Sequence, residues 1–513
     1  MSLDINITAK REVEIYERNV TYNLADMYYK CIDKEQGFKK LDGMNCKEAL
    51  PIIYHAISDM LNNADEYRKL NPKNGWGSYD GLLATLQEMR NCCENNPDGT
   101  INVFWKELII LSKADEIKNL KIFTDNIEDE AVKQIDLLLE QEPFKNCKVR
   151  IMPDVHAGKG CVIGFTADLG DKVIPNIVGV DIGCGMLCVE LGKIDIDLEK
   201  FDEIVNNYIP AGRNIRESKL TNFEKIKELY CFRELKETNK FEKAIGTLGG
   251  GNHFIELNVD NENNKYLVIH TGSRNMGKQV ADYYQNLAIE LCSGKEEMWK
   301  RKAEIISTYK EQGRKSEIQK ALKELEKEYK NNQPNLPKEL CYLTGEYRED
   351  YLHDMQICQE YASLNRKYIA LEILNKYEII AMNKFETIHN YICFEDNIVR
   401  KGAIRANKGE RVIIPINMRD GSIIAIGKGN EDWNNSAPHG AGRIMSRMKA
   451  KETFKLDEFK KSMEGIYTTS VVKETIDEAP FVYKPMQEII HNIKDTVEIE
   501  KIIKPIYNFK AKN

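Results

Sequence analysis

A carboxylate and a thiol lie three residues apart in a glycine-rich stretch of this chain. Asp181 and Cys184 occur in the sequence Gly-Val-Asp-Ile-Gly-Cys-Gly, residues 179–185, where the glycines let the backbone turn so that both side chains converge on one point. Such a pair could share one metal ion, and a thiolate can also bridge two ions. Mixed sulfur, nitrogen and oxygen ligands favour manganese, iron or zinc over magnesium, which prefers oxygen. The alternative interpretation is a tight turn with a buried cysteine after a strand.

Three histidines favour the metal interpretation. The chain has only 8 histidines, and His253, His270 and His389 each lie in a predicted loop that contains glycine or asparagine. Taken with Asp181 and Cys184, they predict a site for two metal ions. Two ions about 3.5–4 Å apart would clamp an oxyanion during phosphoryl transfer.

A further histidine lies in the sequence Asn-Ser-Ala-Pro-His-Gly-Ala-Gly-Arg, residues 435–443. His439 is flanked by small residues that leave an edge of its ring exposed, and Arg443 would share its face if a helix begins here. A neutral imidazole is a competent nucleophile at phosphorus, and a guanidinium stabilises the oxygens on which charge develops. Three cations upstream predict a local basic groove: Arg400, Lys401 and Arg405.

Length, charge and hydropathy restrict the class of protein. The chain has 513 residues and a net charge of −7, so it is too long for one ordinary core and too acidic for a general nucleic-acid coat. No stretch reaches the roughly 18 apolar residues of a membrane span, and no leader peptide is evident. The 13 cysteines contain no Cys-x-x-Cys pair, which indicates reduced thiols. We expect a cytoplasmic protein with no membrane partner.

The elements that must position these residues fall into two predicted parts. Residues 1–105 are expected to form an N-terminal α/β accessory domain, with a strand-like run from Glu12 to Tyr22 and helical patterns at 49–62 and 81–93. Residues 106–513 are expected to form the catalytic domain. The charged segment at 293–336 has apolar residues at helical spacing and predicts a solvated helical insertion.

Two further elements bear on the site. An acidic helix at 128–141 and a strand at 148–152 lead to Asp154 and His156, which we expect in a loop just past the strand. An amphipathic helix is predicted at 351–371. It carries Arg366, which could hold either a phosphate or a carboxylate.

Seven motifs of this chain occur in an order that closely resembles the RtcB-type RNA-splicing ligases. They are MPDVHAGKG, VGVDIGCGM, GNHFIE, HTGSR, IHN, RKGAIRA and HGAGR. The resemblance covers roughly Lys121 to the C-terminus. It implies an α+β catalytic fold, GTP and two Mn²⁺ ions as cofactors, and ligation of broken RNA, such as tRNA halves. The joined ends would be a 3′-phosphate or 2′,3′-cyclic phosphate and a 5′-hydroxyl.

The resemblance also implies a ligand set for the two manganese ions. Cys184 would bridge them. Asp181 and His253 would complete one site, and His270 and His389 would complete the other.

Roles at the nucleotide are implied in the same way. His439 would take GMP covalently, and Arg443 would assist at the nucleotide. Where the family usually has a Gly-Ser-Met-Gly turn, this chain reads PINMRDGSI, residues 415–423. The residues assigned to GTP binding are Asn252, Glu256, Ser422, Tyr483 and Lys510.

Two other classes compete with the ligase. A dinuclear metal-dependent phosphoesterase would need the five metal ligands but neither His439 nor Arg443. A noncatalytic protein that binds RNA would need a basic groove but no thiolate between metals. The HGAGR motif therefore favours the ligase.

Overall fold

The computed structural model describes residues 2–9, 13–21, 24–71, 78–106, 119–124, 126–329 and 334–511. The chain divides into two compact units, Met1–Lys118 and Asn119–Asn513. Within the described ranges, no helix is both long enough and apolar enough to cross a membrane.

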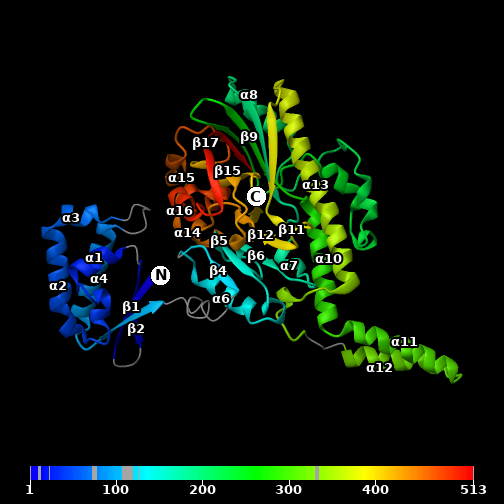
Figure 1. The fold of residues 1–513 in the computed structure, drawn as a ribbon, viewed down its shortest axis with the longest axis horizontal. Coiled ribbons are helices and arrows are strands. Elements are labelled where there is room, and N and C mark those ends of the chain that lie inside the picture. The colour runs from blue at the N-terminus through cyan, green and yellow to red at the C-terminus, as the bar shows by residue number, and fades with distance from the viewer. Residues whose placement is uncertain are drawn as a thin grey trace. The chain divides into compact units, whose positions relative to one another are not determined.

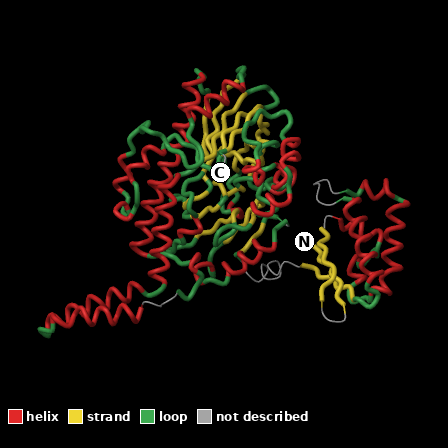
Figure 2. Tube along the Cα trace, turned by 180° about the vertical axis from the view of Figure 1, so that it is seen from behind, coloured by secondary structure: helices red, strands yellow, loops and turns green. Residues whose placement is uncertain are grey.

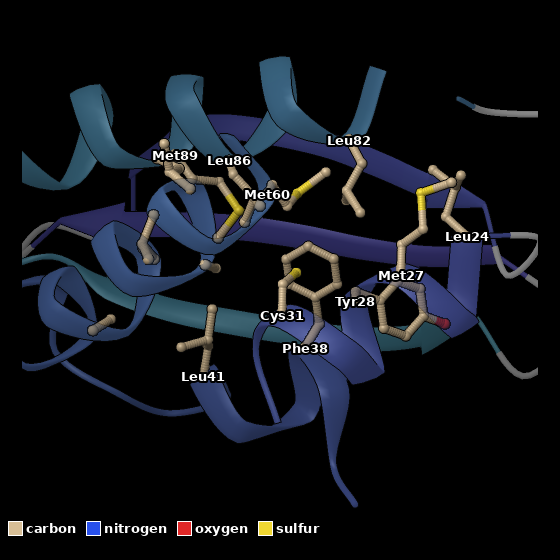
Figure 3. Close-up of a cluster of buried hydrophobic side chains, with 14 of the residues drawn as sticks. Leu24, Met27, Tyr28, Cys31, Phe38, Leu41, Met60, Leu82, Leu86 and Met89 are labelled. Carbon is tan, nitrogen blue, oxygen red and sulfur yellow. The ribbon is translucent and has the colours of Figure 1, made fainter. Parts of the chain in front are cut away.

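The smaller unit packs helices on a three-stranded antiparallel sheet of order β2-β1-β3. Two helices begin at capping side chains: Asn45 accepts a hydrogen bond from the N–H of Lys47, and Ser78 accepts one from the N–H of Gly81. Figure 3 shows Leu82, Leu86 and Met89 of α4 in one apolar cluster with residues of the other helices. The elements are β1 (Ser2–Ala9), β2 (Val13–Thr21), α1 (Ala25–Cys31), α2 (Cys46–Asn62), α3 (Ala64–Lys69), α4 (Tyr79–Asn95) and β3 (Thr100–Lys106).

The larger unit contains a seven-stranded antiparallel sheet of order β10-β7-β9-β8-β17-β15-β14. Its strands lie in the middle of the unit, with helices outside them (Figure 2). The strands are β7 (Gly185–Gly192), β8 (Phe254–Val259), β9 (Lys265–Thr271), β10 (Asn383–Ile388), β14 (Arg411–Asn417), β15 (Gly421–Gly427) and β17 (Val497–Lys510).

Alternation along β9 decides which way one predicted ligand points. Leu267 and Ile269 join the apolar cluster formed with α8 (Leu198–Tyr208) and α13 (Gly345–Tyr377), whereas Val268 belongs to a second cluster. Successive side chains of a strand point to opposite faces of the sheet. His270 therefore projects from the face opposite α13.

A second sheet of five strands, order β11-β12-β6-β5-β4, lies in the same unit with a two-stranded pair, β13-β16. Strand β5 runs to His156, so Asp154 and His156 lie at the end of the strand itself and not in a loop beyond it. The strands are β4 (Leu120–Ile122), β5 (Val149–His156), β6 (Ile163–Asp168), β11 (Asn390–Ile392), β12 (Ile398–Lys401), β13 (Ala403–Arg405) and β16 (Ser436–Pro438).

Helices cover the sheets from outside, and α10 and α13 lie side by side (Figure 1). Helices α11 and α12 form a hairpin joined by ion pairs such as Arg301–Glu328, and only Leu325 is fully buried among their side chains. A seven-stranded antiparallel sheet and a five-stranded sheet that is antiparallel except for the parallel pair β4–β5, with helices around them, confirm the predicted α+β class. The other helices of this unit are α6 (Asp129–Leu139), α7 (Pro175–Val178), α9 (Phe241–Ala244), α10 (Arg274–Cys292), α11 (Lys295–Glu311), α12 (Ile318–Tyr329), α14 (Arg447–Thr453), α15 (Leu456–Ser462) and α16 (Met486–Asn492).

Short 3-10 turns join these elements. They are η2 (Gly37–Leu41), η3 (Glu142–Phe144), η4 (Glu224–Glu228), η5 (Phe232–Glu234), η6 (Thr238–Lys240), η7 (Lys315–Glu317), η8 (Lys338–Leu340), η9 (Glu431–Trp433), η10 (Lys473–Glu478) and η11 (Pro480–Val482).

Candidate active site

The fold brings the five predicted metal ligands together around one thiol. Cys184 Sγ lies 3.5 Å from His253 Nε2 and 3.3 Å from His270 Nε2. His270 Nε2 is 3.3 Å from His389 Nε2, and Asp181 Oδ2 is 2.9 Å from His253 Nε2. Two groups of ligand atoms result, Asp181–Cys184–His253 and Cys184–His270–His389, and each spans no more than 4.8 Å. Cys184 belongs to both.

Backbone pairing sets these ligands in register. Strand β7 pairs with β9 so that Met186 faces His270, and the N–H of His389 donates to the carbonyl oxygen of Cys184 at 3.0 Å. The buried Arg366 guanidinium of α13 donates to the carbonyl oxygens of Gly183 and Thr271 at 2.9 and 2.6 Å. It also pairs with the carboxylate of Glu386. Of the two partners expected for Arg366, the structure gives it a carboxylate.

Backbone carbonyls fix the tautomers of two of the histidines. Leu248 accepts a hydrogen bond from His253 Nδ1 at 2.9 Å, and Asn252 accepts one from His270 Nδ1 at 3.2 Å. A carbonyl oxygen can only accept, so each Nδ1 carries a proton and each Nε2 is the ring nitrogen turned toward the cluster, where it presents a lone pair when the ring is neutral. This arrangement orients histidines for a metal.

The charge state of the cluster also fits a cation. Burial, with help from neighbouring histidines, lowers the pKa values of His270 and His389 well below the ordinary value, so both rings are neutral. Burial and Asp181 raise the pKa of the Cys184 thiol well above its ordinary value. Neutral lone pairs that converge at these distances repel one another unless a cation lies among them, and a cation would also stabilise the thiolate. The donor set of sulfur, nitrogen and carboxylate oxygen suits manganese, iron or zinc.

Space at the Asp181 carboxylate depends on a glycine. A Cβ at Gly272 would lie 2.0 Å from Asp181 Oδ1. The glycine of the HTGSR motif therefore lets the end of β9 approach the carboxylate. Burial alone would raise the pKa of Asp181, but His253 outweighs it and lowers that pKa to about 2.

His439 lies next to this cluster and has its own carboxylate. Its ring centroid is 4.7 Å from that of His389. Asp154 Oδ2 accepts a hydrogen bond from His439 Nδ1 at 2.6 Å and from the backbone N–H groups of His439 and Gly440 at 3.1 Å each. Asp154 is fully buried and accepts from Nδ1, so in the neutral His439 ring the proton is on Nδ1 and the lone pair is on Nε2. The sequence had indicated no partner for His439.

The glycines of the HGAGR motif allow this approach. Gly442 has φ +76°, and a Cβ there would lie 2.3 Å from the carbonyl oxygen of Asp154. No helix begins at His439, since α14 starts at Arg447. Arg443 instead pairs through its backbone with Tyr483.

A cavity of about 120 Å³ opens beside His439. Seven residues that were assigned a role from the sequence line it, together with others that were assigned none at this site. The predicted ones are Asn252, Glu256, His270, His439, Arg443, Tyr483 and Lys510, and the others include His156, Phe254, Asn417, Arg447 and Glu478.

Glu478 contacts the cations that line one end of the cavity. Its carboxylate accepts hydrogen bonds from Tyr483 Oη at 2.6 Å and Lys510 Nζ at 2.7 Å, and it pairs with Arg447 at 2.9 Å and Arg443 at 3.5 Å. Burial by itself would raise the pKa of Glu478, but Lys510 and the two arginines outweigh it and lower that pKa to about 2. Glu478 is therefore ionised and holds four side chains in place.

Glu256 has a different environment. It is almost fully buried and accepts hydrogen bonds from the side-chain amides of Asn508 at 2.7 Å and Asn258 at 3.3 Å. Burial raises its pKa to about 7. The amide donors and the nearby Lys510 lower this pKa, but they offset only part of the rise that burial causes.

Ser422 lies apart from the cavity lining. It pairs with Pro415 across β14 and β15, and its side chain is fully buried. From the same segment, residues 415–418 line the cavity instead.

The three upstream cations do not form a free basic surface. Arg400 is buried and pairs with Asp396, and Arg405 pairs with Glu395 and Glu410. Lys401 Nζ donates to the carbonyl oxygens of Lys159 and Asn176. These side chains brace the fold, so the groove predicted from them is not present.

The fold and the site thus define an α+β protein with a candidate two-metal centre at the edge of a polar cavity. The profile of the tRNA-splicing ligase RtcB family matches residues 139–236 and 225–511, and the chain belongs to that family. This confirms the predicted resemblance and makes the chain an RNA ligase by family.

Relatives align over most of their length. The RNA-splicing ligase RtcB of Escherichia coli K12 is 29% identical over 74% of this chain and 94% of the relative. The tRNA-splicing ligase RtcB of Nanoarchaeum equitans is 26% identical over 69% of this chain and 85% of the relative. That of Pyrobaculum aerophilum is 25% identical over 80% of this chain and 98% of the relative.

Proposed function

We propose that this protein is a GTP- and manganese-dependent RNA ligase that works through a guanylylated His439. It would join an RNA 3′-phosphate or 2′,3′-cyclic phosphate end to a 5′-hydroxyl end in tRNA splicing or RNA repair. The observation that carries the proposal is the pair Asp154–His439, which leaves the lone pair of His439 Nε2 beside the metal cluster. We further propose that residues 106–513 form the catalytic domain and residues 1–105 an accessory domain.

Two manganese ions would be held by Asp181, Cys184, His253, His270 and His389. When bound, they supply positive charge that neutralises the phosphate oxygens. The protein itself supplies the nucleophile, the positioning groups and the cations around the nucleotide.

The covalent step uses His439. Its Nε2 forms a bond to the α-phosphorus of GTP, and the bond to the bridging oxygen breaks so that pyrophosphate leaves with the electron pair. Asp154 keeps the proton on Nδ1 and stabilises the charge that the ring acquires. Arg443 and Lys510 line the cavity and would bind the anionic nucleotide, with Asn252, Glu256 and Tyr483 completing the contacts.

Transfer to RNA makes the 3′-phosphate reactive. An oxygen of that phosphate attacks the phosphorus of the GMP group, and His439 leaves with the electron pair. The 5′-hydroxyl then attacks the RNA phosphorus and GMP leaves. A free 3′-phosphate is a poor electrophile because its leaving group would be oxide or hydroxide, so GMP provides the better leaving group. A cyclic phosphate must first be opened by water.

Labelling with α-³²P-GTP and manganese tests the proposal. We expect label on the wild-type protein in an acid-labile, alkali-stable phosphoramidate, and none on His439→Ala. The variant His491→Ala, in α16 and outside the cavity, serves as the matched control and should label like the wild type. His439→Ala should still ligate RNA whose 3′-phosphate already carries GMP.

Two results would contradict the proposal. Label that survives His439→Ala, or that is stable in acid, would place the nucleotide on another residue. A phosphoesterase would take no label in either protein and would keep its activity in the variant.

A further inference from the structure

Two cysteines meet at the root of the α11–α12 hairpin. Cys292 is the last residue of α10, and Cys341 directly follows η8. The Cys292 thiol donates to the carbonyl oxygen of Tyr342, the residue after Cys341, at 3.6 Å, and the Cys341 thiol donates to the carbonyl oxygen of Pro337 at 3.7 Å. The two thiols also interact with each other. The hairpin therefore leaves the body of its unit at one cysteine and returns at the other.

Contacts outside the hairpin hold both cysteines in position. Gln285 of α10 donates to the carbonyl oxygen of Lys338 at 2.7 Å and accepts from the N–H of Asn176 at 2.9 Å. Two residues beyond Cys341, Leu343 exchanges two backbone hydrogen bonds with Val173. The thiol pair is therefore preorganised by α10 and by the segment before α7.

Access distinguishes Cys292 from the other cysteines. All thirteen are described, and only Cys92 and Cys292 are not fully buried. The hydrogen bond from Cys341 lowers the pKa of Cys292 to about 7, whereas burial raises that of Cys92. The thiolate is the reactive form, so Cys292 is the thiol that an oxidant in solution attacks first.

We propose that Cys292 and Cys341 are a redox modification site at which a peroxide forms a disulfide that closes the root of the α11–α12 hairpin. The Cys292 thiolate attacks one peroxide oxygen, the O–O bond breaks, and a sulfenic acid forms as the other oxygen leaves and becomes water. Cys341 sulfur then attacks the sulfenic sulfur, and the hydroxyl group leaves as a second water. Two thiols lose two hydrogens, and a dithiol reductant restores them.

The modification would tie two parts of the scaffold together. Helix α10 begins at Arg274, four residues after His270, and ends at Cys292. A disulfide would join its far end to the segment that pairs with Val173. Neither cysteine lines the cavity or belongs to the metal cluster, so the bond needs neither metal nor nucleotide to form.

Peptide mapping of the full chain tests this site. The reduced protein is treated with a small excess of hydrogen peroxide, quenched with N-ethylmaleimide and digested without reductant. We expect a Cys292–Cys341 cross-linked peptide that dithiothreitol splits. In Cys341→Ser the cross-link should be lost and dimedone should label Cys292 as a sulfenic acid, because the resolving thiol is gone.

Alkylation supplies a matched control. At pH 7 Cys292 should react with iodoacetamide at least ~10-fold faster than Cys92, the other partly exposed cysteine. Cys92→Ser should keep the cross-link, and Cys292→Ser should lose it. Wild type that accumulates dimedone-labelled Cys292 without a cross-link, or in which Cys292 stays unoxidised while other thiols react, would overturn the proposal.

Discussion

Two aspartate–histidine pairs lie in one site, and they differ in which nitrogen of the imidazole ring the carboxylate meets. In Asp154–His439 the carboxylate holds Nδ1 at 2.6 Å and leaves Nε2 free. In Asp181–His253 a backbone carbonyl holds Nδ1, and the carboxylate lies 2.9 Å from Nε2 itself. The first pair is complete without a cation. In the second, the carboxylate and Nε2 approach each other within a candidate ligand group, where either a proton on Nε2 or a bound cation can join them.

The comparison shows how one pair of residue types serves two purposes. Which ring nitrogen meets the carboxylate decides whether the imidazole presents a lone pair to a substrate or to a metal. The following predictions separate these two roles, from the largest expected effect to the smallest.

Removal of the Cys184 thiol should abolish metal binding and leave the Asp154–His439 pair intact. Cys184 lies in both ligand groups, so Cys184→Ala should lose both bound ions and all transfer of GMP, as measured by manganese content and by labelling. Cys188→Ala, a buried residue of β7 outside both groups, should bind metal and label nearly as the wild type does. Equal manganese content in wild type and Cys184→Ala would refute the two-metal interpretation.

A change of the Asp154 carboxylate to an amide should impair the His439 nucleophile and leave metal binding intact. In Asp154→Asn the amide can donate to Nδ1, which moves the ring proton to Nε2 and removes the lone pair. We expect guanylylation to slow by about 10²–10⁴-fold with unchanged manganese content. Loss of metal together with activity would mean that the two pairs are not separate. Asp171→Asn, at an exposed ion pair with Lys172, is the matched control and should leave the rate unaltered.

A third buried carboxylate, Glu256, is hydrogen-bonded by amides and not by a histidine. We expect it to affect how protein stability depends on pH. Its pKa is raised from 4.5 to about 7 in the folded state, so its stabilising contribution is complete below about pH 4.5 and is lost as the pH rises to about 7. Glu256→Gln should reduce the fall in melting temperature over this range. A melting curve with the wild-type pH dependence would show that Glu256 does not titrate there.

The α11–α12 hairpin should matter least to the chemistry. None of the described residues of 293–336 is a metal ligand or lines the cavity. Replacement of that segment with a short Gly/Ser linker should leave guanylylation within about twofold of the wild type. A folded deletion variant, checked by circular dichroism, that fails to take label would show that the hairpin supports the site.

The sequence predicted much of the local structure and the residues that come together in the candidate metal cluster. The acidic pattern at 128–141 is α6, and the pattern at 351–371 lies inside α13, because helical periodicity is a local property. The five candidate ligands could be selected because they lie in distinctive motifs. Asp154 could not be paired with His439, since 285 residues separate them and one aspartate resembles another in sequence.

Charged residues were the hardest to interpret. Arg400, Lys401 and Arg405 look like a basic groove in sequence, yet each has internal partners that only the tertiary fold provides. Glu478 was missed for the complementary reason, because its importance comes from three cations and a tyrosine hydroxyl that arrive from separate positions of the chain.

Glu478 also means that an anionic ligand must compete with a carboxylate of the protein for the cations of the cavity. Lys510, Arg447 and Arg443 already have an anionic partner within the protein, so an incoming phosphate competes with Glu478 instead of meeting bare cations. Binding becomes an exchange of partners in which the number of ionic contacts changes little. Discrimination then rests on how well a ligand's geometry outcompetes one fixed carboxylate, and a simple inorganic anion gains little from entering.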